Sequence, residues 1–161
     1  MQMVTARFDH PDARKLNDMV QAEYAVRYGS EGDVTPLAPE MFDPPRGLFL
    51  MVYDPQGRPV ATGGWRSQED AEEGYSPGDA EIKRMFVVEE ARGLGLARRI
   101  LARLEDTARE AGRVRMVLET GTKQPEAMQL YRSSGYVLLP EERKFGVYRC
   151  EPGSRCFVKP L

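Results

Sequence analysis

An apolar run, a turn with two glycines and an amphipathic segment follow one another between residues 82 and 111. This order predicts a strand, a tight turn and a helix. The helical stripe consists of Ala97, Ile100, Leu101, Leu104, Ala108 and Ala111, and Gly112 follows where a C-terminal cap belongs. A second apolar run at residues 114–120 predicts another strand. A strand, helix and strand in this order place the two strands parallel, with a right-handed crossover.

The turn between the first strand and the helix has the composition of an anion-binding site. Gly93 and Gly95 can take backbone angles that other residues avoid, and neither has a side chain to block an anion. The free N–H groups and the dipole at the start of a helix favour a negative charge, and Arg92 adds a cation. By itself, such a turn is equally compatible with a phosphate cradle and with a plain strand-to-helix connection.

Three motifs in one order resemble those of the GNAT superfamily of acyl-CoA-dependent N-acetyltransferases. They are Glu81-Ile82-Lys83-Arg84-Met85-Phe86-Val87, then Arg92-Gly93-Leu94-Gly95-Leu96-Ala97, which fits an Arg/Gln-x-x-Gly-x-Gly/Ala signature, then Gln124 to Tyr131 with Gly135-Tyr136. The match covers roughly residues 48–158. The resemblance implies an α/β fold with a mixed, mostly antiparallel central sheet, flanking helices and a parallel βαβ unit at the CoA site. We expect residues 1–161 to form a single domain of this type.

The other elements are predicted from turn residues and apolar spacing. A helix is expected from Pro11 to Gly29, with Ala13, Leu16, Met19, Val20 and Tyr24 on one face, and another from Pro125 to Gly135. The remaining expectations are strands at 4–8, 47–53, 60–66, 136–139, 146–150 and 154–159, an exposed acidic loop at 68–78, and an irregular connection at 30–46 with a short helix at 39–42.

The resemblance also implies which residues hold acetyl-CoA. The diphosphate would lie on the turn and first helical residues, Arg92, Gly93, Leu94, Gly95, Leu96, Ala97 and Arg98. Backbone groups of Phe86 and Val87 would pair with the pantetheine amides, in a V between strands that splay near Val87 and Leu118. Gln124 stands where the family often has Asn, a residue that contacts the pantetheine arm, and its side chain is one methylene longer.

Two residues are candidates for proton transfer. An ammonium has no lone pair with which to attack, so amine acylation needs a base. Glu81 lies eleven positions before Arg92 and matches a glutamate base of some family members; the alternative is a strand-edge residue paired with Lys83 or Arg84. Tyr131 matches the tyrosine that in many GNAT enzymes protonates the departing thiolate, and the alternative is a packed aromatic.

The bulk properties restrict the partners. The formal net charge of −2 gives no positive field for nucleic acid, and no apolar stretch approaches the ~20 residues of a membrane span. With two cysteines and one histidine the chain shows no metal-binding spacing, so we expect no metal and a cytoplasmic location. His10, before Pro11, is expected to begin a helix, and Cys156 is expected to be a buried strand residue rather than a nucleophile.

The acceptor is the least defined part of the site. The segment after the first helix commonly covers the acceptor in this superfamily, which points to Tyr24, Tyr28 and residues 30–46. Trp65 and the acidic residues 69–73 could attract a cationic amine, although core and surface roles are the favoured alternatives. We expect acetyl transfer to a primary amine of a small molecule. A protein lysine or N-terminal acetyltransferase, a non-catalytic acyl-CoA sensor and a homodimer formed through a sheet edge remain open.

Overall fold

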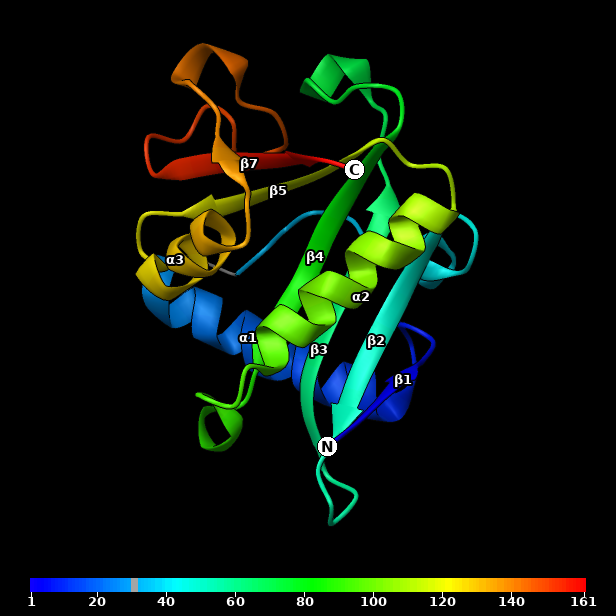
Figure 1. Ribbon diagram of the computed structural model, residues 1–161. Helices are drawn as coiled ribbons and strands as arrows, with labels where there is room; N and C mark the ends of the chain where they lie inside the picture. Colours follow the sequence, from blue (N-terminus) through cyan, green and yellow to red (C-terminus); the bar gives the residue numbers. More distant parts are fainter. Residues whose placement is uncertain (30–31) are drawn as a thin grey trace.

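The computed structural model describes residues 1–29 and 32–161, in which seven strands form one sheet flanked by helices (Figure 1). The strands are β1 (Gln2–Thr5), β2 (Gly47–Tyr53), β3 (Pro59–Ser67), β4 (Asp79–Val87), β5 (Arg115–Gly121), β6 (Val137–Leu138) and β7 (Ser154–Pro160). The α-helices are α1 (Pro11–Tyr28), α2 (Leu96–Glu110) and α3 (Pro125–Ser133), and residues Pro39–Phe42 form a short 3₁₀ turn. The order is β1-β2-β3-β4-β5-β7-β6, with only β4 and β5 parallel. The expected mixed, mostly antiparallel sheet with one parallel βαβ unit is therefore confirmed.

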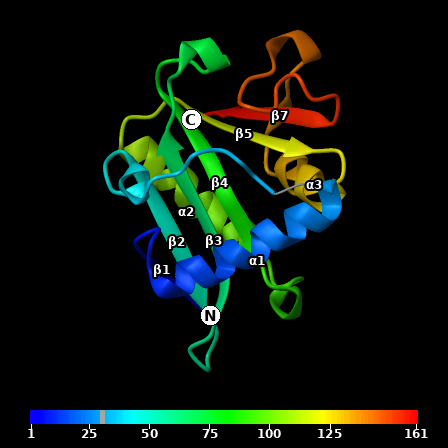
Figure 2. The ribbon, with the colours of Figure 1, turned by 180° about the vertical axis from the view of Figure 1, so that it is seen from behind.

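Two helices cover opposite faces of the sheet, which we call the α1 face and the α2 face (Figures 1 and 2). Successive side chains of a strand point to opposite faces of the sheet, and two adjacent residues of β3 illustrate this. Trp65 is buried on the α2 face, where its Nε1 donates to Thr107 Oγ1 at 3.0 Å. Arg66 points to the α1 face and bonds Glu81. Trp65 is thus a core aromatic, as the alternative interpretation held.

The parallel strands pair only at their beginnings. The register joins residues 79–81 of β4 to residues 115–117 of β5. Beyond these residues β4 runs on to Val87 and β5 to Gly121 without pairing with each other. A bulge bends β4 within this unpaired part, since the pairing with β3 shifts between Thr62 and Gly64 and Arg84 has a φ of 60°. The two strands therefore diverge beyond Glu81, which leaves the V that the family resemblance implied (Figure 1).

Three local expectations are wrong. The first strand spans residues 2–5 rather than 4–8, because Phe8 turns away to stack on Phe42, with ring centroids 4.6 Å apart. Residues 146–150 form a turn, because β5 and β6 already occupy both edges of β7. Met19 is 41% exposed and does not share the buried face of α1.

Several other expectations are confirmed. His10 caps α1 by accepting a hydrogen bond from the Asp12 backbone N–H at 3.0 Å, Gly29 ends α1 in the left-handed conformation, and Cys156 is buried in β7. Among the described residues, no helix has both the length and the apolar character that a membrane crossing requires.

Candidate active site

The turn before α2 combines backbone N–H groups that have no helical acceptor with open space beside its two glycines. Gly93 and Gly95 have φ values of 83° and 77°, which favour glycine, and a methyl group at either position would meet no atom within 4 Å. Arg99 makes the first backbone bond of the helix, to Gly95 O at 3.1 Å. The N–H groups of residues 96–98 consequently have no helical acceptor. The geometry of this turn suits an anion.

The two arginines beside the turn are each held by neighbouring groups. Arg92 donates from Nε to Val87 O at 3.1 Å, and its Nη2 lies 3.5 Å from a carboxylate oxygen of Glu23 on α1. Arg98 donates to the hydroxyls of Ser133 and Ser134, at 2.7 and 3.3 Å, and so joins α2 to the end of α3. Arg92 therefore lies at the mouth of the turn, whereas Arg98 points toward α3.

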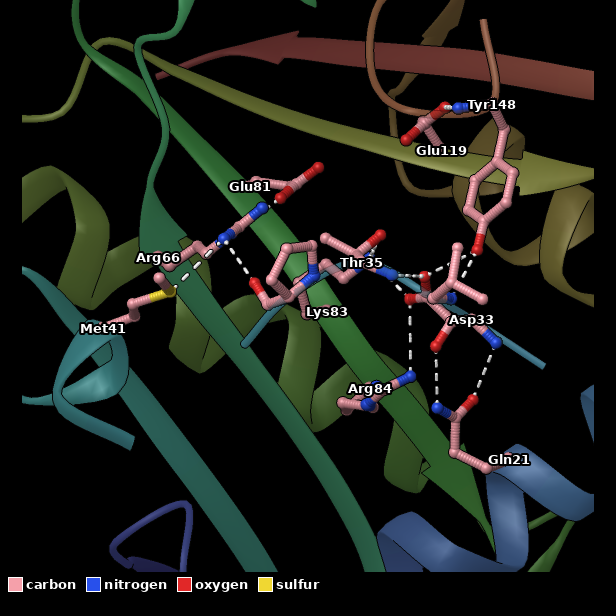
Figure 3. Close-up of polar contacts among 12 residues, drawn as sticks. Gln21, Asp33, Thr35, Met41, Arg66, Glu81, Lys83, Arg84, Glu119 and Tyr148 are labelled. Atoms are coloured by element: carbon pink, nitrogen blue, oxygen red, sulfur yellow. Dashed lines mark hydrogen bonds and ion pairs between the residues drawn. The ribbon is translucent and has the colours of Figure 1, made fainter. Parts of the chain in front are cut away.

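Glu81 lies at the point where β4 and β5 diverge, and both of its carboxylate oxygens are engaged. The side chain is 1% exposed. Its Oε1 accepts from Arg66 Nε at 2.8 Å (Figure 3). Its Oε2 accepts from the Tyr75 hydroxyl. The partner is thus Arg66 on β3, so the alternative pairing of Glu81 with Lys83 or Arg84 is wrong.

Glu119 is a second carboxylate of the V that the sequence analysis missed. It stands on β5 two residues after Val117, the partner of Glu81, so both carboxylates belong to the α1 face (Figure 3). Its Oε2 accepts from the Tyr148 backbone N–H at 3.1 Å. The carboxylate fits because residue 146 is a glycine, since a side chain at position 146 would occupy the same space. A lone acidic residue directly after the apolar run 116–118 was the available sequence signal.

The surroundings of Glu119 adapt it to proton transfer near neutral pH. Burial, followed by the negative charge of Glu81, raises the pKa of Glu119 to about 7, although Lys83 acts in the opposite direction. A carboxyl group with this pKa is partly ionised at pH 7 and can both accept and release a proton.

Tyr131, a residue of α3, lies over the face of β5 opposite to that of Glu119. It is buried, and its ring packs on Tyr136 and Phe157 at centroid distances of 5.5 and 6.1 Å. Phe157 pairs with Leu118, whose side chain alternates with that of Glu119, so the tyrosine and this glutamate flank the V from opposite sides. Burial raises the pKa of Tyr131, which keeps its hydroxyl protonated. This hydroxyl makes no hydrogen bond to another described residue.

The rim of the V is formed by residues that the sequence analysis assigned to the pantetheine arm. Phe86 and Val87 pair with β3 on one side only, so the edge of β4 that faces β5 is open there. Gln124 donates from Nε2 to the Tyr28 hydroxyl at 2.8 Å, and this hydroxyl lies against the backbone of Gly121. Gln124 is therefore beside the V, with its amide bound to α1.

A polar cluster centred on Asp33 covers the α1 face beside these groups (Figure 3). Asp33 Oδ2 lies 2.7 Å from Lys83 Nζ and 3.4 Å from Arg84 Nη1, and Oδ1 accepts from the Tyr148 hydroxyl at 2.9 Å. Its backbone exchanges two hydrogen bonds with the Gln21 side chain of α1. Burial opposes ionisation of Asp33, but Lys83 holds its pKa below the usual range. The connection after α1 thus lies over this face, although its first two residues, Ser30 and Glu31, are outside the described part.

The acidic residues 69–73 lie at the paired end of β4, whereas Tyr75 of the same loop is buried and donates to Glu81. Glu69 is 3.6 Å from Arg113, and Asp70 accepts the backbone N–H of Glu72 within a short 3₁₀ turn. Both residues precede Asp79, where β4 begins and pairs with β5. The favoured surface role of the acidic residues agrees with that position, but the expectation of an exposed loop is wrong for Tyr75.

The comparisons with known proteins agree with this architecture. The sequence model of the acetyltransferase (GNAT) family matches residues 13–136, so the chain belongs to the GNAT family. Over 92 residues the chain is 44% identical to an IAA acetyltransferase from Azospirillum brasilense, an alignment that covers 57% of this chain and 56% of that protein. The chain therefore spans little more than half of the length of this relative.

Solved structures share the fold. A protein from Klebsiella pneumoniae subsp. pneumoniae, provisionally described as an acyl-CoA N-acyltransferase, is 27% identical with a TM-score of 0.76, and the match covers 99% of this chain and 97% of that chain. A streptothricin acetyltransferase structure from Bacillus anthracis, also a provisional description, contains acetyl coenzyme A. It is 16% identical with a TM-score of 0.61, covering 78% of this chain and 69% of that chain. The second likeness concerns the fold alone.

Proposed function

We propose that this protein transfers an acetyl group from acetyl-CoA to a primary amine of a small molecule, directly within a ternary complex. The divergence of β4 and β5 carries the proposal. The V between these strands has a turn with free N–H donors at one end. Two groups suited to proton transfer, Glu119 and Tyr131, lie on its two sides. Membership of the GNAT family supports an acyl-CoA donor.

The fit of the donor rests on the turn before α2 and on the open edge of β4. Residues 92–98 would bind the diphosphate through backbone N–H groups, with Arg92 adding a positive charge. Phe86 and Val87 would pair with the pantetheine amides, and Gln124 would contact the arm after releasing Tyr28. Acetyl-CoA would supply the thioester, and the chain would hold it between Glu119 and Tyr131.

We assign to Glu119 the role of the base that accepts the proton of the attacking amine. A base must be able to take up a proton, and the pKa of Glu119 lies near 7. Glu81 remains the alternative base, but Arg66 and Tyr75 already donate to its two oxygens. In our proposal Glu81 is a fixed neighbouring anion that raises the proton affinity of Glu119.

We assign to Tyr131 the role of the acid that donates a proton to the departing CoA. As the amine nitrogen bonds the carbonyl carbon and the carbon–sulfur bond breaks, negative charge develops on the sulfur of CoA. The Tyr131 hydroxyl donates its proton to that sulfur, because burial keeps it protonated and no described residue accepts its hydrogen bond.

Replacing Tyr131 by Phe tests this function. With a panel of small amines, and with peptides that offer a lysine or a free N-terminus, we expect the wild type to release CoA and Tyr131→Phe to do so at least about 100-fold more slowly. Binding of acetyl-CoA, measured by calorimetry, should change little. If both proteins bind acetyl-CoA and neither turns over any amine, the protein is a sensor and not an enzyme.

A substitution in the turn before α2 tests the diphosphate site. Gly95→Ala should cost about 1–2 kcal/mol of folding free energy through its positive φ. It should also weaken acetyl-CoA binding at least about tenfold, because relaxation of φ would move the first N–H groups of the helix. Gly57→Ala is the matched control, since Gly57 has a φ of 78°, equally open space and a position in the β2–β3 turn. Equal losses of affinity in both variants would contradict the assignment.

A further inference from the structure

Arg84 is a buried cation with little of its hydrogen-bonding capacity used. The residue is 8% exposed, and Nη1 makes its one hydrogen bond to a described residue, to Asp33 Oδ2 at 3.4 Å. Its Nε is buried and has no partner among the described residues. A buried donor without an acceptor is costly, more so on a charged group. The positive φ of Arg84 adds to that cost.

The other buried charges on the α1 face are matched in pairs. Arg66 Nε lies 2.8 Å from Glu81, and Lys83 Nζ lies 2.7 Å from Asp33. Arg84 shares Asp33 only at the longer distance, so among residues 1–29 and 32–161 it has no carboxylate of its own. Within the described part of the chain this face therefore has one positive charge in excess beside Glu119 when Glu119 is protonated.

A chain of hydrogen bonds joins Arg84 to Glu119, the group proposed as the base. Asp33 bonds Arg84 through one oxygen and the Tyr148 hydroxyl through the other, and the backbone N–H of Tyr148 bonds Glu119. Burial raises the pKa of Tyr24 on α1 to about 12, although the charge of Arg84 acts in the opposite direction. Tyr24 in turn adds to the effect of burial in raising the pKa of Tyr131. Arg84 and Glu119 are thus linked through Asp33 and Tyr148 (Figure 3).

We propose that the acceptor is an amine that also carries a carboxylate, and that Arg84 binds this carboxylate while the amine reaches Glu119. This inference rests on the proposed function. Nε and a terminal nitrogen of a guanidinium can bind the two oxygens of a carboxylate side by side. An amine with one carboxylate enters as a zwitterion, so it adds no net charge to a buried site in which Glu119 is ionised, whereas a simple ammonium adds an uncompensated cation. A phosphate dianion would bring more negative charge than Arg84 can balance.

The test compares acceptors that differ only at the carboxylate. Glycine, 3-aminopropanoate, 4-aminobutanoate and 5-aminopentanoate are each assayed beside the corresponding carboxamide, with acetyl-CoA saturating. For the chain length that fits best, we expect kcat/KM of the wild type to favour the carboxylate by about 10- to 100-fold. Arg84→Gln should lose this preference and retain activity on the carboxamide within a few-fold. Arg84→Lys, which keeps the charge without the planar fork, should retain part of it.

Arg109→Gln is the matched control, because Arg109 is an exposed arginine of α2 that pairs with Asp106. It should retain the full preference. The wild-type comparison requires no variant, so it decides the question even if Arg84→Gln does not fold. Turnover of carboxylates and carboxamides at equal rates would overturn the inference and leave the proposed function intact, as would a preference that Arg84→Gln leaves unchanged. Absence of turnover with every amine would instead refute the proposed function.

Discussion

Replacement of Glu119 by Gln is expected to lower kcat by about 100- to 10,000-fold while acetyl-CoA still binds. Gln has the shape of Glu and can still accept from the Tyr148 N–H, but it cannot take up the proton of the attacking amine. The measurement is the pH dependence of kcat with two acceptors whose ammonium groups differ in pKa. For the wild type, an acid limb near pH 7 should be the same for both acceptors, and it should be absent in the variant.

Two outcomes would contradict this assignment. A limb that follows the pKa of the acceptor would show that the amine loses its proton before binding. A loss of activity in Glu81→Gln together with an active Glu119→Gln would make Glu81 the base. Glu126→Gln is a suitable control, because Glu126 is an exposed carboxylate on α3 and its loss should leave kcat unchanged.

The same variant should change the pH dependence of stability. The pKa of Glu119 is about 7 in the folded chain and 4.5 for the free side chain. Between these values the folded state binds more protons than the unfolded state, so the stability of the wild type falls as pH rises through this window. Gln cannot ionise, so the free energy of unfolding of Glu119→Gln should rise relative to that of the wild type from about pH 4.5 to pH 7. Denaturant unfolding at several pH values measures the difference.

Replacement of Arg66 by Met is expected to destabilise the fold by about 3–5 kcal/mol, because it leaves the Glu81 carboxylate buried without its cation. Tyr75 would still donate one hydrogen bond to Glu81, but a hydroxyl does not compensate a full charge. Arg66 also donates to Pro36 O and Met41 Sδ, so its loss should loosen the connection over the α1 face. Urea denaturation of the wild type and the variant gives the free-energy difference.

The double variant Arg66→Met/Glu81→Gln separates the charge from the packing. If an unpaired buried charge is the cause, removing Glu81 as well should restore most of the lost stability. Arg58→Met is the control, since the pair Arg58–Asp54 involves a 75% exposed arginine and should contribute 0–1 kcal/mol. A loss in Arg66→Met no larger than that in Arg58→Met would refute this account of the ion pair.

Elements with local signals were predicted well. The stripe of α2, the proline that begins α1 and the glycine that ends it depend on residues three or four positions apart, so a short stretch of sequence contains the information. The parallel pairing of β4 and β5 also follows from local order, since a strand, helix and strand allow little else. The prediction of a strand at residues 146–150 was wrong for the opposite reason. Whether an edge of β7 is free for pairing depends on segments elsewhere in the chain, and β5 and β6 occupy both edges.

The sequence by itself determined the strand–turn–helix unit, the family to which it belongs and the placement of Glu81 on a strand and of Tyr131 on a helix. Only the tertiary structure decided which charges meet. Asp33, Arg84, Glu119 and Tyr148 come from four separate segments, and no periodicity relates them. Their ion pairs and the pKa of Glu119 depend on burial and on distances between side chains, which exist only once the connection after α1 and the turn before β7 have packed on the α1 face.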